Sequence, residues 1–307
     1  MEKVILEGIL FESCPLCRGG NTNVIGALAN PISSNNIDVR LDISNSSLNL
    51  MICNSCKLIY KNYSISDEDE FLLQEKWSKE NSSRWSSFSP IRIQKFSEKI
   101  KQIIQLEFGK VRCSILDIGA GEGGYLDHLH ECERFSLDVN PESSQINSGR
   151  GINTMIADIC DKSLKPMKRF DVITCFDVFE HLRDPKTAIK NINKLLNKGG
   201  ILILETGNIE SYLPRVFNPC NWWYVDIPEH KIFWSKSSLA FSFELEGLDM
   251  FHIEKTVHKG HALLSTRNLR NMVITNCSGI FGSKFRVKNK LKVFFKDHLF
   301  VIGRKSI

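Results

Sequence analysis

Four of the ten cysteines form two short pairs, Cys14-Pro-Leu-Cys17 and Cys53-Asn-Ser-Cys56. Each CxxC turn can present two thiolates to one Zn²⁺, and two such turns supply the four sulfur ligands of a closed structural site. The intervening residues 18–52 exceed the usual spacing of about 15–20 residues, and a polar hairpin would fill the difference. A redox role is the alternative, although redox chemistry usually needs only one pair at the start of a helix. We predict structural zinc at Cys14, Cys17, Cys53 and Cys56.

Residues 116–124 read LDIGAGEGG, a glycine-rich turn in which Gly119, Gly121 and Gly124 match the pattern GxGxxG. Glycines at a strand-to-helix turn allow a ligand to approach the backbone closely. The pattern alone also describes dinucleotide sites, so it does not identify the ligand.

Acidic residues near the turn distinguish between its possible ligands. Five acidic residues lie at or just after expected strand ends, where doubly wound sheets bind ligands. They are Asp117, Glu122, Asp138, Asp158 and Asp177. These charges would repel a pyrophosphate and attract a ligand that carries a sulfonium and an ammonium group. Asp138 is placed to accept hydrogen bonds from both ribose hydroxyls. The alternative for each acid is a helix N-cap.

The elements that position these residues alternate between strand and helix. We expect strands over 113–118, 134–139, 153–157, 170–176 and 200–206, and helices over 90–109, 123–130, 141–149 and 184–197. This alternation predicts a doubly wound α/β fold with a parallel sheet. Residues 207–235 are irregular and aromatic, and a helix over 236–246 and strands over 250–257 and 298–304 follow them.

Five segments in this order resemble the class I S-adenosylmethionine (SAM)-dependent methyltransferases of type 11 or 23. They are residues 116–123, 137–140, 157–159, 170–182 and 195–206. The resemblance implies a seven-stranded sheet whose last strand is antiparallel. It also implies Gly119 and Gly121 against the methionine moiety, Asp138 on the ribose and Asp158 near the adenine amine. Asp117 and Asp177 complete the expected cofactor-binding set.

The segment WWYVDIPEH (222–230), followed by Phe233, resembles an aromatic loop of methyltransferases found with glycan-assembly enzymes. The match is partial, because Lys231-Ile232 stands where those relatives carry a second aromatic residue or a histidine. A zinc ribbon ahead of the catalytic domain is similarly a feature of sugar C- and O-methyltransferases. The resemblance therefore implies a sugar, nucleotide sugar or glycan precursor as substrate.

Methyl transfer requires a nucleophile held in line with the methyl carbon and, for a hydroxyl or carbon acid, a base. The candidate bases are His230 and His181, with Tyr224 and Glu180 as helpers. We prefer His230, because residues 207–235 follow the fifth strand and should cover the acceptor side. Either histidine can instead be structural. Similarly, Trp222, Trp223 and Phe233 can form a substrate wall or belong to the core.

We expect a zinc-binding ribbon over residues 1–62, a linker and lead-in helix over 63–111, and a methyltransferase domain over 112–307. A basic helical insertion occupies 258–296, and its segment 284–296 interleaves lysines and arginines with apolar residues. That pattern is typical of a helix that contacts a membrane surface or an anionic substrate, and also of a solvated helix face.

The formal net charge of +5 is too small to indicate a nucleic-acid partner. The first ten residues lack the basic start of a signal peptide, which favours a cytoplasmic location. Two alternatives to a small-molecule enzyme stay open. One is an RNA-directed methyltransferase, or nucleic-acid-binding protein, that grips RNA through the ribbon and the basic segment. The other is a SAM-binding regulator without turnover.

Overall fold

The computed structural model describes residues 2–28, 32–34, 37–42, 47–66, 69, 90–110, 112–122, 124–165, 168–216, 218–227, 229–257 and 296–306. The basic insertion predicted over 258–296 lies outside these residues except for Lys296, as does most of the predicted linker. Among the described helices, none is long and apolar enough to span a bilayer.

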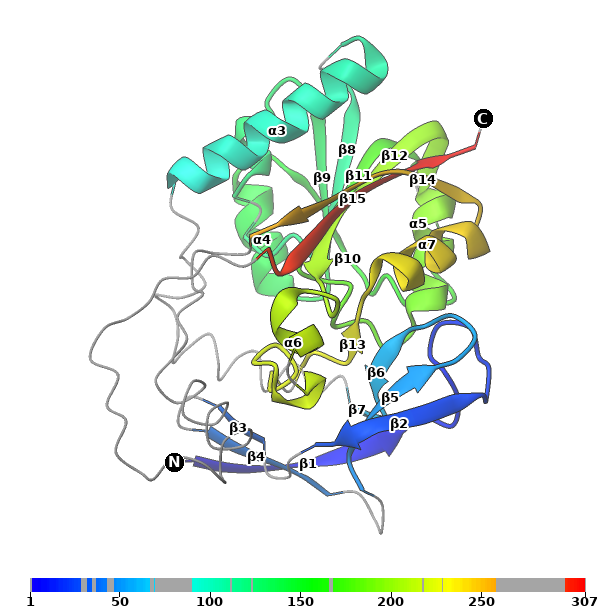
Figure 1. The fold of residues 1–307 in the computed structure, drawn as a ribbon. Coiled ribbons are helices and arrows are strands. Elements are labelled where there is room, and N and C mark those ends of the chain that lie inside the picture. Colours follow the sequence, from blue (N-terminus) through cyan, green and yellow to red (C-terminus); the bar gives the residue numbers. More distant parts are fainter. Residues whose placement is uncertain are drawn as a thin grey trace, which may run out of the picture.

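A seven-stranded sheet forms the centre of the molecule (Figure 1). Its strands are β8 (Ser114–Ile118), β9 (Glu133–Asp138), β10 (Asn153–Ile156), β11 (Phe170–Phe176), β12 (Leu196–Gly207), β14 (Leu248–Thr256) and β15 (His298–Lys305). The order is β10-β9-β8-β11-β12-β15-β14, and β15 runs antiparallel to both of its neighbours. The doubly wound fold expected from the sequence, with its antiparallel last strand, is confirmed.

Helices cover both faces of this sheet, which explains why its central strands are apolar at almost every position. The described helices of this domain are α3 (Pro90–Phe108), α4 (Pro141–Gly149), α5 (Pro185–Leu195), α6 (Tyr212–Val216) and α7 (Lys236–Leu245). On one face, α3 packs Ile100 and Ile104 against Ile115 and its neighbours. On the other face, α5 and α7 pack against alternate residues such as Leu116 and Leu202.

Local signals set the starts of the helices. The Asp184 carboxylate accepts a hydrogen bond from the Thr187 backbone N–H at 3.1 Å, and Pro185 occupies the first turn of α5. Ser235 and Ser238 form a reciprocal capping box at the start of α7. The helix predicted over 123–130 is reduced to a 3₁₀ turn at Leu126–His128, since glycines at its start disfavour a regular helix.

The N-terminal region forms two small sheets. Its strands are β1 (Glu2–Leu10), β2 (Thr22–Ala27), β3 (Ile32–Ser34), β4 (Ile37–Asp42), β5 (Asn49–Cys53), β6 (Ile59–Lys61) and β7 (Tyr63–Ile65). One sheet has the order β3-β4-β1-β7. The other has the order β13-β6-β5-β2, and its strand β13 (Ile232–Phe233) comes from the aromatic region. The N-terminal region therefore shares a sheet with the segment that follows His230.

Candidate active site and cysteine cluster

The glycine turn begins where β8 ends. Gly119 has φ 67° and Gly121 has φ 50°, backbone conformations that favour glycine. A Cβ at Gly119 would lie 2.3 Å from a methyl group of Val178, so no larger residue fits there. The Gly121 N–H donates to the Asp138 carboxylate at 2.8 Å, which joins the end of β8 to the end of β9. The predicted turn and the predicted ribose acid are therefore adjacent.

The acids near the turn have different surroundings. Asp138 is half-buried and accepts a second backbone hydrogen bond, from Asn140 at 2.9 Å. Asp117 is buried and accepts a hydrogen bond from the Thr174 hydroxyl at 2.9 Å. Burial raises the pKa of Asp117 to about 7. The buried Asp117 thus supports the glycine turn from inside the protein. A direct contact between Asp117 and a cofactor stays a prediction.

Asp158 and Asp177 lie at other strand ends of the same sheet edge. Asp158 follows β10, accepts a hydrogen bond from the Cys160 backbone at 2.7 Å and lines a hollow of about 780 Å³ with residues of the N-terminal region. Asp177 ends β11 in the left-handed conformation (φ 52°). Such a backbone is uncommon outside glycine, and it typically occurs at functional sites.

A cluster next to Asp177 contains all four predicted catalytic residues, of which Glu180, Tyr224 and His230 are buried and His181 is half-buried. Tyr224 donates its hydroxyl hydrogen to Glu180 at 2.5 Å, and Thr206 donates to the other Glu180 oxygen at 2.8 Å. Burial and the nearby charge of Asp177 raise the pKa of Glu180 to about 7. The pKa of Tyr224 is well above its usual range because of burial and the Glu180 charge, so Tyr224 keeps its proton at neutral pH.

The two candidate bases are in contact, because the rings of His181 and His230 are 4.7 Å apart in an edge-to-face arrangement. His230 Nδ1 lies 2.9 Å from the Tyr224 carbonyl oxygen, and only the protonated nitrogen can donate there, so the neutral ring carries its lone pair on Nε2. Burial lowers the pKa of His230 well below its usual value and that of His181 to about 4. Both rings are therefore neutral at pH 7.

Glu180, His181 and His230 place one potential ligand atom each within 4.8 Å of one another. Both carboxylate oxygens of Glu180 already accept hydrogen bonds from Tyr224 and Thr206. Glu180 therefore lies at the centre of a hydrogen-bonded network.

The structure also brings in residues that the sequence analysis did not select. His298 at the start of β15 is fully buried, and its Nε2 lies 3.7 Å from Asp177. Burial opposes a charge on this ring, but the hydrogen bond with Asp297 and the Asp177 charge outweigh it and raise the His298 pKa. Lys61 and Lys231 are buried close to the histidines. None of these three residues belongs to a recognisable motif, and only the fold brings them together.

The aromatic residues of the loop divide between core and surface. Trp222 and Phe233 are buried in one cluster with Leu50 of β5, so they belong to the core and not to a substrate wall. Tyr224 packs directly against Gly207, because a Cβ at Gly207 would lie 2.3 Å from the Tyr224 ring. Trp223 is half-buried and is the one of these four aromatic residues that is left to line an acceptor site.

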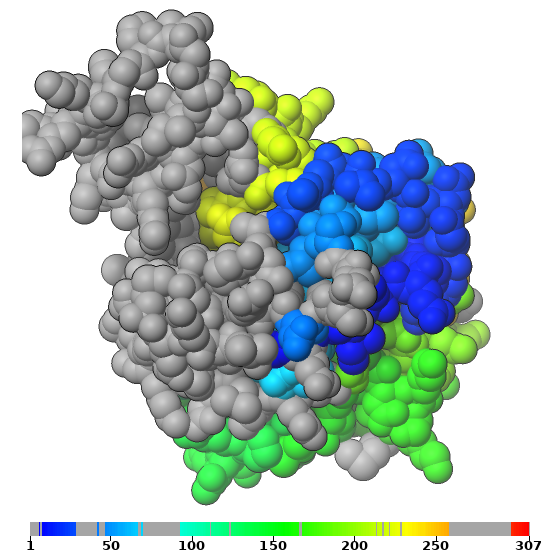
Figure 2. Space-filling view, turned by 90° about the horizontal axis from the view of Figure 1, so that it is seen from below, coloured from blue at the N-terminus to red at the C-terminus, as the bar shows by residue number. Residues whose placement is uncertain are grey.

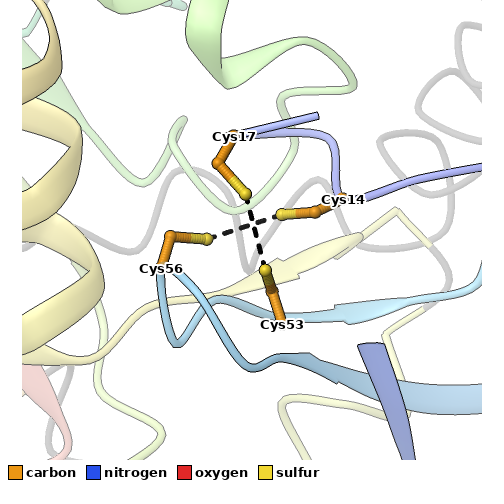
Figure 3. A group of neighbouring side chains, drawn as sticks. All are labelled: Cys14, Cys17, Cys53 and Cys56. Carbon is orange, nitrogen blue, oxygen red and sulfur yellow. Dashed lines mark hydrogen bonds between the residues drawn. The ribbon is translucent and has the colours of Figure 1, made fainter. Parts of the chain in front are cut away.

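The four predicted cysteine ligands converge (Figure 3). The sulfur atoms of Cys14 and Cys56 are 3.5 Å apart, as are those of Cys17 and Cys53, and all four lie within 4.8 Å of one another. Four thiolates around one Zn²⁺ at about 2.3 Å would be separated by roughly 3.8 Å. The sulfur positions therefore suit a tetrahedral metal ion.

The two cysteine turns have the same backbone design. In each, the residue after the second cysteine adopts a positive φ, 62° at Arg18 and 60° at Lys57. Its N–H donates at 2.9 Å to the carbonyl oxygen of the first cysteine of the pair. The hydrogen bond between Cys14 and Cys56 lowers the pKa of Cys14 and raises that of Cys56, so Cys14 is the thiol of this pair that ionises more readily. A redox pair would not require this repeated turn.

Comparison with known proteins agrees with this geometry. A family model described as a methyltransferase domain matches residues 91–253. A ubiquinone biosynthesis O-methyltransferase of Colwellia psychrerythraea is 28% identical over 138 residues, 41% of this chain and 56% of that protein. The Coxiella burnetii protein of the same name (strain Dugway 5J108-111) is 32% identical over 135 residues, 41% of this chain and 54% of that protein. The chain thus spans about half the length of the curated relatives it matches.

Among solved structures, a putative methyltransferase from Bacillus halodurans has a TM-score of 0.52 at 14% identity. The alignment covers 68% of this chain and the whole of that protein. At this identity the likeness concerns the fold alone.

Proposed function

The chain belongs to the methyltransferase domain family, and from that premise we propose that it transfers a methyl group from SAM to a small-molecule acceptor. The observation that carries this proposal is the adjacency of two sites. Gly119 of the glycine turn packs against Val178, which follows Asp177 directly, and the charge of Asp177 acts on Glu180 of the buried hydrogen-bond network.

The residues of the first site suit SAM. When bound, SAM supplies a methyl carbon that its sulfonium already activates. The space beside Gly121 is open, so a methionine moiety can approach the turn there, whereas the space beside Gly119 is filled by Val178. Asp138 has free lone pairs for the ribose hydroxyls beside its two backbone hydrogen bonds. Asp158, in the hollow, would meet the adenine amine. Acids at these positions favour a cation over a pyrophosphate.

In the second site, His230 is the proposed base. Its tautomer is fixed by the Tyr224 carbonyl, so Nε2 can take a proton from the acceptor as the methyl group moves to it. The ring is neutral at pH 7 because of burial, so no proton must leave before the reaction. The hydrogen bond from Tyr224 to Glu180 holds the loop that carries this ring, and the Glu180 carboxylate, when ionised, can stabilise a protonated imidazole. His181, in ring contact with His230, is the alternative base.

We further propose that Cys14, Cys17, Cys53 and Cys56 hold one structural Zn²⁺. The repeated turns and the sulfur separations support this proposal. No fifth ligand from the described residues joins the cluster, so the metal would stabilise the fold and not contact the substrate. Thiolate ligands also favour a reducing compartment such as the cytoplasm.

For the acceptor we propose a sugar, nucleotide sugar or glycan precursor. The support is the resemblance of residues 222–230 to the aromatic loop described above, together with the cysteine-rich region ahead of the domain. A phenolic hydroxyl is the second candidate, because the curated relatives are named ubiquinone biosynthesis O-methyltransferases. That likeness covers 41% of the chain.

A methyl-transfer screen distinguishes these acceptors. Purified protein with methyl-labelled SAM is offered nucleotide sugars, polyprenylated catechols and total tRNA, and the label is followed by mass spectrometry. We expect labelled nucleotide sugar. Labelled catechol would move the proposal to the second candidate, and labelled tRNA would overturn a small-molecule acceptor. Calorimetry should show SAM binding and no NAD binding, and tighter binding of NAD would overturn the cofactor assignment.

A further inference from the structure

The segment that follows His230 is held between two other parts of the chain. On one side it forms β13, which pairs with β6 of the N-terminal region, and the Lys61 N–H donates to the Lys231 carbonyl at 2.9 Å. On the other side, the N–H groups of Lys231 and Ile232 donate to the Glu180 carbonyl at 2.8 and 3.1 Å. The indole N–H of Trp234 donates to the Phe179 carbonyl at 3.0 Å. The active-site segment therefore joins the cysteine-rich sheet to the end of β11.

Lys61 makes the most unusual contact in this region. Its side chain is 1% exposed, and its Nζ donates to the Ile227 carbonyl at 2.8 Å, three residues before His230. Burial lowers the pKa of Lys61 to about 7, so the charged form is present at and below neutral pH. Charged groups around it come from the loop, namely Asp226, Glu229 and Lys231. Burying a lysine is costly unless its ammonium is bound, and an apolar residue would pack there at lower cost. The contact with the loop accounts for a lysine at this position.

The same residue is close to the cysteine cluster along the chain. Cys53 ends β5, the turn at Cys56 leads into β6, and Lys61 is the last residue of β6, paired with Leu50 of β5. Figure 2 shows the surface of the N-terminal region, in blue, directly against the yellow surface of the segment around residues 210–230. An ordered cysteine turn therefore sets the position of the Lys61 ammonium through one short hairpin.

We propose that Lys61 is a positioning residue of the acceptor site, which fixes the segment carrying His230 to the metal-binding hairpin and makes the order of that segment depend on the cysteine cluster. The inference rests on the proposed role of His230 and deepens it. The N-terminal region thereby forms part of the acceptor site without any of its residues reacting.

Electrostatics supports this arrangement. Besides burial and the charge of His181, the Lys61 ammonium lowers the pKa of His230. It acts in the same direction on His181, after burial and the charge of Lys231. Loss of the ammonium should therefore both free the loop and allow the His230 imidazole to bind a proton more readily. A residue that only filled space would affect neither property through its charge.

The test compares Lys61→Met with Lys61→Arg in the full chain, and uses Lys236→Met, at an exposed lysine of α7, as the matched control. Hydrogen exchange of residues 222–233 and NMR titration of the histidine rings are measured, together with SAM affinity and zinc content. In Lys61→Met we expect exchange about tenfold faster in this segment and a raised His230 pKa, with SAM affinity and zinc content unchanged. Lys61→Arg should restore the histidine pKa, and the control should match the wild type.

A second arm uses the wild-type protein and a zinc chelator, so the test does not depend on how the variants fold. Metal removal should speed exchange in residues 222–233 and leave β8 and β11 protected. Unchanged exchange in this segment after metal removal, or in a folded Lys61→Met protein, would overturn the proposal. Failure of the wild type to bind SAM would instead count against the proposed function, which separates the two outcomes.

Discussion

The two halves of the candidate active site are built in opposite ways. The cofactor half consists of short features in chain order within one sheet, namely the turn after β8 and single acids at the ends of β9, β10 and β11. The acceptor half combines Glu180, Thr206, Tyr224 and His230 with Lys61 from a separate sheet. A site for a common cofactor can thus be encoded by a short local motif, whereas the acceptor site depends on tertiary contacts between distant segments.

The largest effect should come from the acceptor half. We expect His230→Ala to reduce turnover by roughly 10²–10⁴-fold, the usual contribution of a positioned base. SAM affinity should be nearly unchanged, because the glycine turn is not altered. Initial rates with the acceptor found in the screen and calorimetry with SAM measure the two properties.

The control for this variant is His252→Ala, at an exposed histidine of β14. His181→Ala should change both turnover and SAM affinity, because His181 follows β11 closer to the cofactor half. Normal turnover in His230→Ala would transfer the role of base to His181, since Tyr224 keeps its proton at neutral pH. A loss confined to SAM binding would mean that His230 shapes the cofactor site.

Metal loss should have the next largest effect. Cys53→Ser removes one of four thiolates, so we expect loss of zinc and much faster proteolysis of residues 1–62, because metal binding supplies much of the folding free energy of such small units. Elemental analysis and limited proteolysis measure this. Cys220→Ser, outside the cluster, should keep its metal. Zinc-free wild-type protein purified without chelators would contradict the assignment.

A smaller effect is expected in the cofactor half. Asp138→Ala should weaken SAM binding by about 1–3 kcal/mol, since the ribose hydroxyls and the Gly121 N–H lose their acceptor. Calorimetry measures the change, and Asp249→Ala at an exposed position of β14 is the control. Unchanged affinity would remove Asp138 from the site and weaken the contrast between the two halves.

The last predicted effect is on stability and depends on pH. Because the pKa of Asp117 is raised to about 7 in the folded protein, the unfolded chain releases this proton at lower pH than the folded one. Stability should therefore fall as pH rises from about 4 to about 7. Asp117→Asn should remove the share of this decline that Asp117 contributes, which is on the order of 1–4 kcal/mol. Glu180, whose pKa is also raised to about 7, should keep its own share.

Urea unfolding at pH 5 and pH 8 tests the Asp117 prediction, with Asp249→Asn as the exposed control. The difference between the two pH values should shrink only in Asp117→Asn. An equal pH dependence in this variant and the wild type would mean that Asp117 is ionised in the folded protein at both pH values.

The contrast between the halves also explains what the sequence could predict. Strand-helix periodicity predicted the central sheet and the helices beside it. The predicted bounds of the helix over 141–149 and of the strand over 170–176 are confirmed. Cysteine spacing predicted a four-thiol cluster, and the structure brings the four sulfur atoms together. Lys61 and His298 were not predicted, because neither belongs to a motif and their role depends on the partners that the fold supplies. The burial of Trp222 was an open alternative, since an aromatic residue in a loop suits both a core and a binding wall.

The pairing of β6 with β13 has a consequence for how the protein is made. Its partners Tyr60 and Ile232 are separated by most of the chain. The cysteine hairpin leaves the ribosome early, but its edge strand β6 has no partner until β13 in the aromatic region has been synthesised. Contacts between such distant residues form late and slowly. We therefore expect the nascent N-terminal region to expose an unpaired, apolar strand edge for most of translation, which makes it the part of the chain with the greatest need of a chaperone.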